Sequence, residues 1–413
     1  AMPRKDKAFV TEVVNGTLRN IIYVDYVINE YSKTKTDKLK LYVLAVLRMS
    51  VYQIIFMDRV PDSAACSEAV ALVKKRGLVF LGNYVNGVLR TVIRNKDDIK
   101  LPEKGTAEYI SVKYSHPLWL VKMWLAKYDF EATEKICIAG NTAPDVTLCV
   151  NRLKTTPTAL AEMLRKNGIS VKTGVHYENA LHIKGSSNLA ETEMFKVGLF
   201  HVQDESSMLA VKLLDPKPDE KILDVCAAPG GKSFLAAELM DNKGKVVSCD
   251  IHEHKLGLME ETKTRLGIKI VETKLRDAMI VHGEDYEKFD RVIVDAPCSG
   301  FGLIRKKPDI KMNKTGDDID SLIVLQQDIL RVSAECVKVG GTLVYSTCTI
   351  CKKENEMNVK KFLAEHKNFE PVDITELLPE NLRGYAENGM IQLLPGIHET
   401  DGFFIAVMRK NGH

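Results

Sequence analysis

The feature that most constrains the fold is an alternation of short apolar runs with helical stretches from about residue 203 to the C-terminus. The apolar runs are 222–226, 246–249, 292–294 and 342–346, and helical stretches such as 233–240 and 317–337 lie between them. Alternation of this kind is typical of a doubly wound α/β domain with a largely parallel sheet. We expect this domain to cover residues 203–413.

The preceding part of the chain has a different pattern, which predicts two further domains. Apolar residues at three- and four-residue spacing predict helices at 6–19, 21–31, 38–57, 63–76 and 79–95, with a short helix after His116-Pro117. We therefore expect an all-α domain of bundle type over residues 1–125. Over residues 126–202, β-like runs at 146–153 and 180–184 flank a helix at 158–166. This pattern predicts a small α+β module.

Charge is unevenly distributed along the chain, although the net charge is only +3. Residues 1–120 hold 19 Lys and Arg against 12 Asp and Glu, whereas the remaining residues hold 39 against 43. A basic module joined to a neutral-to-acidic one suits a polyanion-binding domain attached to a catalytic domain. An ordinary solvated surface, on which the charges happen to be unevenly distributed, also explains a surplus of basic residues of this size.

The nine cysteines lack the regular spacing of a disulfide framework, which favours a reducing, cytoplasmic compartment. A structural zinc site is not expected, because Cys348 and Cys351 form the single Cys-x-x-Cys pair in the chain. No apolar run approaches the roughly 20 residues of a membrane span, and no signal peptide precedes the first helix. We expect no membrane or metal partner and a monomeric protein.

Small and acidic residues follow the strands of the predicted sheet and indicate a nucleoside cofactor. The loop from Asp224 to Ser233 contains two glycines, which let the backbone pass close to a ligand. Asp250 ends the second strand 26 residues after Asp224, where its carboxylate can accept both hydroxyls of a ribose. Asp277 and Asp295 end two further candidate strands. Each aspartate alone could equally be a cap or turn residue. The inference of a nucleoside cofactor depends on all of them together.

The alternative for this loop is a phosphate-binding loop of the form Gly-x-x-x-x-Gly-Lys-Ser/Thr. Position 226, where the first glycine of that pattern would stand, is a cysteine. Asp224 and Asp250 would also repel a triphosphate, whereas an adenosyl sulfonium is a cation and tolerates carboxylates. The sequence therefore favours the sulfonium cofactor.

Two cysteines follow strands at the same edge of the sheet. Cys298 lies in Asp-Ala-Pro-Cys-Ser-Gly and Cys348 in Tyr-Ser-Thr-Cys-Thr. Either cysteine alone is more often a small buried hydrophobe. Together they suit methylation at C5 of cytosine, because a thiolate that adds to C6 makes C5 nucleophilic. Asp295 could bind the N3/N4 edge of the base, a second thiol could assist release, and Lys232 is a candidate cation for thiolate ionisation.

At these residues the sequence resembles the RNA (cytosine-5)-methyltransferases, and within them the bacterial Sun/RsmB type. The segments that carry the resemblance are 224–233, 295–300 and 346–349, with further matches at 202–207, 305–309, 326–327 and 401–404. Residues 9–19 and 85–94 resemble the NusB-like RNA-binding domain of this branch. The resemblance implies an all-α NusB-like N-terminal domain, a small α+β linker module and a C-terminal α/β Rossmann-like domain that uses S-adenosylmethionine.

The resemblance also implies residue roles. Cys348 is implied to be the nucleophile and Cys298 to aid product release, whereas DNA cytosine methyltransferases use a Pro-Cys cysteine as nucleophile, which is the alternative assignment. The implied cofactor contacts are Cys226, Ala227, Ala228, Pro229, Gly230, Gly231, Lys232, Asp250, Asp277 and Asp295. The implied substrate is a cytosine in small-subunit (16S) rRNA, with a tRNA cytosine as the alternative. Members of this type begin with a further helix or two before the point matching Asp6, so the helical domain is expected to be incomplete at its N-terminus.

The target base must be unstacked or flipped to expose C5 and C6. Arg305, Lys306 and Lys307 follow the Cys298 loop and are candidates to bind flanking RNA phosphates, although an ordinary solvated basic cluster also fits. The helical domain is expected to add phosphate contacts. A hypothesis from another class is a non-catalytic RNA-binding or antitermination-like protein. It predicts a degenerate cofactor loop or the loss of Cys348, and the sequence shows neither.

Overall fold

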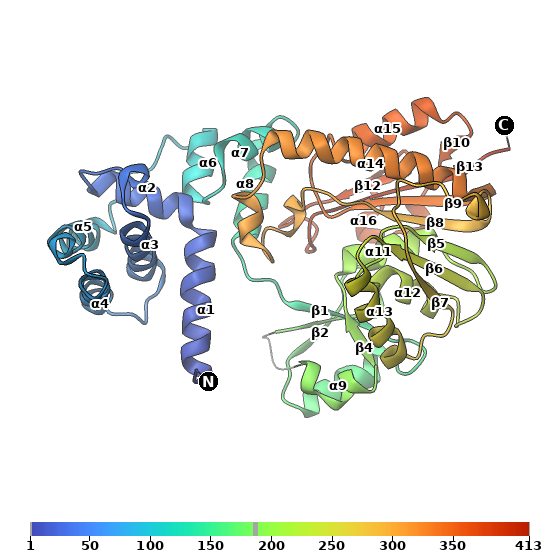
Figure 1. Ribbon diagram of the computed structural model, residues 1–413, viewed down its shortest axis with the longest axis horizontal. Helices are drawn as coiled ribbons and strands as arrows, with labels where there is room; N and C mark the ends of the chain where they lie inside the picture. The colour runs from blue at the N-terminus through green and yellow to red at the C-terminus, as the bar shows by residue number, and fades with distance from the viewer. Residues whose placement is uncertain (1, 185–188, 413) are drawn as a thin grey trace. The chain divides into compact units, whose positions relative to one another are not determined.

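The computed structural model describes residues 2–184 and 189–412, which form two compact units (Figure 1). The first unit comprises Ala1–Thr142 and Ile304–Asn313, and the second comprises Ala143–Leu303 and Lys314–His413. Residues 185–188 of the expected α+β module lie outside the described residues.

The first unit is all-α, as the apolar spacing predicts. Its helices are α1 (Arg4–Arg19), α2 (Ile21–Tyr31), α3 (Leu41–Phe56), α4 (Asp62–Lys75), α5 (Gly82–Asn95), α6 (Ala107–Lys113), α7 (Leu118–Leu125) and α8 (Phe130–Gly140). The apolar stripes of α2 to α5 meet in one core, in which Val27, Leu47, Val73 and Leu89 are fully buried. The boundary predicted at residue 125 stays a prediction, and the compact unit continues through α8 to Thr142.

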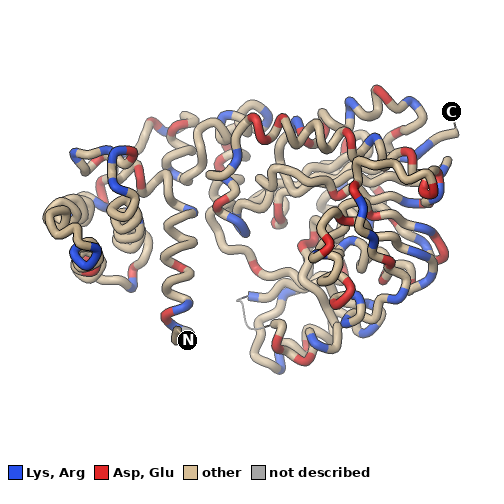
Figure 2. Tube along the Cα trace, viewed as in Figure 1, with Lys and Arg blue, Asp and Glu red and all other residues tan. Residues whose placement is uncertain are grey.

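The charges of the first unit are mixed rather than collected on one helix. Lys and Arg are interspersed with Asp and Glu along its helices (Figure 2), and some of them pair, as Arg48 does with Asp25 at 2.6 Å. A dedicated polyanion-binding surface on this unit therefore stays a prediction.

Lys311 is a buried cation in the first unit. It ends the short helix η6 (Pro308–Lys311) in the segment Ile304–Asn313, and its side chain is 1% exposed. Its Nζ donates to the carbonyl of Arg19 at 2.5 Å and to Oδ1 of Asn141 at 3.3 Å. Burial lowers the pKa of Lys311 to about 7, against the opposing effect of the Cys137 side chain and with a small further lowering from Arg19.

This buried lysine predicts a pH-dependent stability. Above about pH 7 and below the unfolded pKa of 10.5, the unfolded chain binds a proton that folded Lys311 lacks. The free energy of unfolding then rises with pH, by at most about 1.4 kcal/mol per pH unit. The stability of wild type relative to Lys311→Met should therefore increase from pH 7 to pH 9 in thermal or urea unfolding. His116 and Cys137 also face Lys311, but burial is the largest cause of both of their shifts: it lowers the pKa of His116 well below its ordinary value and raises that of Cys137, so neither gains or loses a proton in either folded protein between pH 7 and pH 9.

Lys307→Met, at an exposed position of the same segment, is the control and should parallel wild type over this pH range. Parallel stability curves for wild type and Lys311→Met would show that Lys311 stays charged in the folded protein.

The second unit begins with a small antiparallel sheet of order β2-β3-β1-β4. Its elements are β1 (Val146–Val150), α9 (Pro157–Lys166), β2 (Val171–Thr173), β3 (Ala180–Ile183), α10 (Glu193–Lys196) and β4 (Phe200–Val202). Leu160 and Leu164 of α9 pack on Leu148 and Leu181 of the sheet. The α+β prediction is confirmed, and β2 and β4 are additional strands that the apolar runs did not indicate.

The large sheet has nine strands, of which β7-β6-β5-β8-β9 are parallel. The strands are β5 (Lys221–Asp224), β6 (Lys245–Asp250), β7 (Val271–Leu275), β8 (Phe289–Asp295), β9 (Val337–Thr347), β10 (Phe369–Pro371), β11 (Ala386–Glu387), β12 (Met390–Leu393) and β13 (Phe403–Lys410). The helices are α11 (Glu205–Leu214), α12 (Gly231–Leu239), α13 (Glu253–Leu266), α14 (Gly316–Cys336), α15 (Glu356–Glu365) and α16 (Glu380–Arg383). The four predicted strands correspond to β5, β6, β8 and β9, which confirms a Rossmann-like domain.

Helices cover both faces of this sheet. Ile222 of β5 packs into the same core as Phe234 of α12, whereas its neighbour Leu223 packs into the core that contains Leu330 of α14. Successive strand residues point to opposite faces, so a strand buried on both sides is a continuous apolar run. Beyond β9, strands β13, β12 and β11 continue the sheet in antiparallel order.

Candidate active site

The loop between β5 and α12 is closed tightly and lined by small residues. Ala227 N donates to Cys249 O at 2.8 Å and Gly230 N donates to Ala227 O at 2.7 Å. Gly230 has a φ of 101°, and a Cβ there would lie 2.5 Å from the Phe234 ring. A side chain is therefore excluded at Gly230 by both backbone conformation and space. The result is a cradle of bare backbone at the carboxyl edge of the sheet.

Three aspartates lie at or just after the carboxyl ends of β5, β6 and β7. Asp224, 1% exposed, accepts a hydrogen bond from Ser233 Oγ at 2.7 Å, and burial raises its pKa to about 7. Asp250 ends β6 and accepts from His252 N at 2.9 Å. Asp277 lies two residues after β7 and accepts from Met279 N at 2.9 Å. A cradle without side chains, together with carboxylates at or just after these strand ends, fits a cationic nucleoside cofactor.

Lys232 and Asp295 form an ion pair next to this loop. Lys232 Nζ lies 2.7 Å from Asp295 Oδ2, and Ser346 Oγ donates to Asp295 Oδ1 at 2.9 Å. The parallel register places Asp295 opposite Ser346 at the ends of β8 and β9. Lys232 Nζ also lies 5.2 Å from the ring centroid of Phe403. Asp295 is thus held from two sides, and the expected contribution of Lys232 to thiolate ionisation stays a prediction.

The two predicted cysteines meet at this edge. Cys298 Sγ and Cys348 Sγ are 3.2 Å apart, although 50 residues separate them in sequence. Both residues are partly exposed, so neither sulfur is sealed in the apolar core. The hydrogen bond with Cys348, together with burial of the sulfur, raises the pKa of Cys298 well above its ordinary value. Either sulfur can be the donor in this contact.

Comparison with known proteins agrees with this arrangement. The profile of the 16S rRNA methyltransferase RsmB/F family matches residues 211–409, and the NusB family profile matches residues 1–94. A third profile, the ferredoxin-like domain of RsmF/B-like methyltransferases, matches residues 116–190. The probable ribosomal RNA small subunit methyltransferase B of Bacillus subtilis is 45% identical over 99% of this chain and 91% of its own length. The chain belongs to the RsmB/F methyltransferase family.

Further relatives of this RsmB/F protein extend over nearly the whole chain. The probable ribosomal RNA small subunit methyltransferase B of Synechocystis is 34% identical over 98% of this chain and 91% of its own length. The crystal structure of PH0851 has a TM-score of 0.82 at 30% identity, and covers 99% of this chain and 91% of its own. A methyltransferase homologue from Pyrococcus horikoshii has a TM-score of 0.63 at 28% identity, and the match covers 75% of this chain and 100% of that one. The protein is therefore an S-adenosylmethionine-dependent RNA methyltransferase with NusB-like, ferredoxin-like and Rossmann-like domains.

Two glycines connect the Cys348 loop of this RsmB/F enzyme to the start of β13. Gly302 N donates to Cys348 O at 3.0 Å, and Gly402 N donates to Gly302 O at 3.0 Å. A Cβ at Gly302 would lie 1.8 Å from Gly402 O. Only glycine permits this approach of two backbones, which brings Phe403 to the site.

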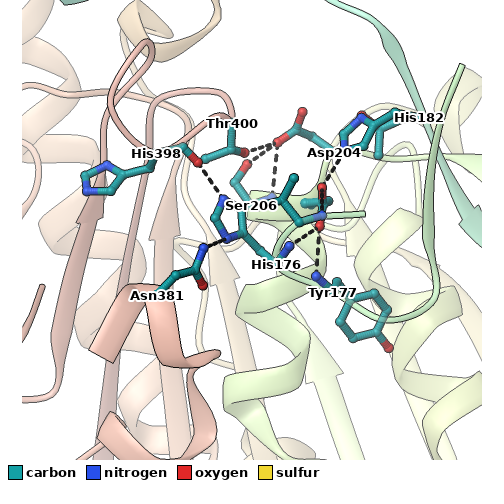
Figure 3. Close-up of polar contacts among 11 residues, drawn as sticks. His176, Tyr177, His182, Asp204, Ser206, Asn381, His398 and Thr400 are labelled. Atoms are coloured by element: carbon teal, nitrogen blue, oxygen red, sulfur yellow. Dashed lines mark hydrogen bonds and ion pairs between the residues drawn. The ribbon is translucent and has the colours of Figure 1, made fainter. Parts of the chain in front are cut away.

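A buried polar network anchors the loop that precedes Phe403 (Figure 3). Thr400 Oγ1 donates to Asp204 Oδ1 at 2.9 Å, and His176 Nε2 lies 2.5 Å from His398 O. The other His176 nitrogen lies 3.3 Å from Asn381 Nδ2. The resemblance pointed to residues 401–404 without a role for them. The network itself could not be predicted from the sequence, because its members are far apart along the chain.

The predicted RNA-binding residues and the two cysteines belong to different compact units. Arg305, Lys306 and Lys307 lie in the segment Ile304–Asn313, which belongs to the first unit, whereas Cys298 and Cys348 belong to the second. Lys306 and Lys307 are exposed and Arg305 is half-buried. Their role in RNA binding stays a prediction.

Among residues 2–184 and 189–412, no three or more His, Cys, Asp or Glu side chains gather as metal ligands. Over the same described ranges, every helix is too short or too polar to cross a membrane.

Proposed function

We propose that this enzyme methylates C5 of a cytosine in small-subunit rRNA through a covalent bond between Cys348 and C6. The observation that carries the proposal is the meeting of the Cys298 and Cys348 sulfurs, 3.2 Å apart, at the sheet edge that also holds the cofactor loop. The names of the curated relatives, which are small-subunit rRNA methyltransferases, support the choice of RNA.

Residues 226–232 and three aspartates would hold the cofactor. S-adenosylmethionine, when bound, supplies an electrophilic methyl group on a sulfonium. The bare backbone around Gly230 would leave room for the cofactor, and Asp250 at the end of β6 would accept hydrogen bonds from its ribose hydroxyls. Asp277 and Asp295 border the same space by their positions after β7 and at the end of β8.

Cys348 would start the reaction on the base. Its thiolate adds to C6, and the electron pair displaced from the C5–C6 bond makes C5 the nucleophile that takes the methyl group. Asp295, fixed by Lys232 and Ser346, would accept a hydrogen bond from the exocyclic amine and orient the ring. Orientation of this kind lowers the barrier because the reacting atoms are already aligned.

Cys298 would assist the end of the reaction. The methylated adduct loses its C5 proton to solvent, the C5–C6 double bond forms again, and the bond between C6 and the Cys348 sulfur breaks. Because the pKa of Cys298 is raised, its thiol stays protonated and donates a hydrogen bond to the departing sulfur. This stabilises the negative charge that develops on Cys348.

Methylation with labelled cofactor tests the proposal. The enzyme is incubated with unmodified small-subunit rRNA or with unmodified tRNA, and the RNA is digested to nucleosides. We expect label in 5-methylcytidine from the rRNA and background label from the tRNA. Label in tRNA, or in another nucleoside, would contradict the substrate or the position, and binding of rRNA without transfer would favour a non-catalytic RNA-binding protein.

A further inference from the structure

A buried carboxylate links the two cysteine loops. Glu354 lies between β9 and α15 and has 0% of its surface exposed. Ser299 donates to it twice, from N to Oε2 at 2.8 Å and from Oγ to Oε1 at 2.5 Å, and Thr349 Oγ1 donates to Oε1 at 3.3 Å. Ser299 follows Cys298 directly, and Thr349 follows Cys348 directly. One carboxylate therefore contacts the residue after each cysteine.

Four donor groups surround the Glu354 carboxylate. Gln326 Nε2 of α14 donates to Oε2 at 3.0 Å and to the carbonyl of Pro297 at 2.9 Å. Ser299 N, Ser299 Oγ and Thr349 Oγ1 are the other donors, and the single Thr349 hydroxyl proton is shared between Glu354 and Ser299 Oγ, which lies 2.7 Å away. All four donor groups are neutral, so hydrogen bonds rather than a cation compensate the buried charge. Loss of any of these hydrogen bonds would leave a buried polar group without a partner, which is costly. The network therefore holds the side chains and loops around Glu354 in one arrangement.

Glu354 makes more and shorter hydrogen bonds to the Cys298 loop than to the Cys348 loop. Its two shortest bonds go to Ser299, and Gln326 ties the same loop again through Pro297. Its negative charge also adds, behind the hydrogen bond with Cys348 and burial, to the causes that raise the pKa of Cys298. The carboxylate thus both fixes the Cys298 loop and favours the protonated thiol.

We propose that Glu354 is a positioning residue for product release, which holds the protonated Cys298 thiol against the departing sulfur of Cys348. The inference rests on the proposed function, because it assumes a covalent adduct that has to be resolved. Glu354 acts through Cys298 and does not itself contact the base.

Glu354→Gln tests this role. The amide keeps the size of the side chain, but its NH2 group cannot accept the bonds that one carboxylate oxygen accepts. We expect the multiple-turnover rate to fall on the order of ten- to a hundred-fold, as for loss of assistance by a positioned thiol. Methyl transfer in the first turnover should fall less than about three-fold, and a denaturant-stable protein–RNA adduct should accumulate.

A double variant and a matched control separate this role from general destabilisation. Cys298→Ala combined with Glu354→Gln should release product no more slowly than Cys298→Ala alone, because one residue acts through the other. Glu238→Gln replaces another fully buried carboxylate, in α12, which accepts from Arg152 N at 3.4 Å, and should release product as wild type does. A first turnover slowed as much as release, or effects that add fully, would overturn the proposal.

Two further results keep the test decisive. If Glu354→Gln does not fold, Ser299→Ala removes the Oγ bonds to Glu354 and Thr349 but keeps the N–H bond to Glu354, and it should shift the balance toward adduct in the same direction. If Cys298→Ala itself leaves no adduct, the proposed assignment of roles to the two cysteines fails, and if Cys348→Ala leaves none either, the covalent mechanism fails with it. If Cys298→Ala traps the adduct while Glu354→Gln and Ser299→Ala release product at the wild-type rate, only the role of Glu354 fails.

Discussion

Replacement of Cys348 by alanine is expected to lower methyl transfer by about 10⁴-fold or more, the loss typical of removing a nucleophile. Without a sulfur to add to C6, C5 of cytosine is too weak a nucleophile to take the methyl group. Because Cys348 is partly exposed, the variant should fold and bind the cofactor as wild type does. Single-turnover transfer of labelled methyl to small-subunit rRNA, with cofactor affinity measured in parallel, checks both statements.

Cys298→Ala is expected to give the opposite phenotype. Methyl transfer should still occur once, after which the RNA stays attached to Cys348 as a denaturant-stable adduct, because no thiol faces the departing sulfur. Cys336→Ala, at a buried cysteine of α14, is the control and should turn over normally. An adduct formed by Cys348→Ala and not by Cys298→Ala would reverse the two roles and match the Pro-Cys chemistry of the DNA enzymes.

Asp295→Asn is expected to lower kcat by roughly 10²- to 10³-fold, the range found when one preorganised polar group is removed from an active site. Asparagine keeps the shape and can still accept from Ser346 Oγ, but it removes the charge that pairs with Lys232 at 2.7 Å. Lys232 would then remain as a nearly buried, unpaired cation beside the base site. Steady-state kinetics with rRNA, together with calorimetric cofactor binding, measures the effect.

Asp290→Asn is the matched control for this prediction. Asp290 lies on the same strand and pairs with Lys338 at 2.6 Å, so the change removes a similar ion pair at the opposite end of β8. We expect its kcat to stay within about two-fold of wild type, as for an exposed pair. If the two variants lose activity equally, or if Asp295→Asn weakens only cofactor binding, Asp295 has no part in orienting the base.

Much of the fold follows from local sequence. Apolar residues at three- and four-residue spacing predicted α1 to α5 and α7 of the first unit but neither α6 nor α8, and continuous apolar runs predicted β5, β6, β8 and β9. Strands β12 and β13 were not predicted. They contain apolar runs of the same kind, but their antiparallel pairing beyond β9 depends on contacts with residues about 60 positions earlier, such as Val407 with Val344.

The candidate site, like the fold, has one part that the sequence predicted and one part that it did not. Parallel strands end at one edge of a sheet, so the sequence alone was enough to predict that Asp250, Asp295, Cys298 and Cys348 lie at that edge. It could not identify Glu354, since a Lys-Lys-Glu-Asn segment is typical of a solvated turn and its burial depends on α14 and on the Cys298 loop.

Sequence alone determined most helices of the first unit, the four central strands of the large sheet, which residues follow those strands, and which chemistry the two cysteines suit. These depend on short-range periodicity and on the common direction of parallel strands. The tertiary structure alone decided that the two sulfurs lie 3.2 Å apart, that Lys232 pairs with Asp295, and that Glu354 is buried between the cysteine loops. The physical reason is that such distances join residues tens of positions apart, and are set by strand register and by side-chain packing that no local pattern encodes.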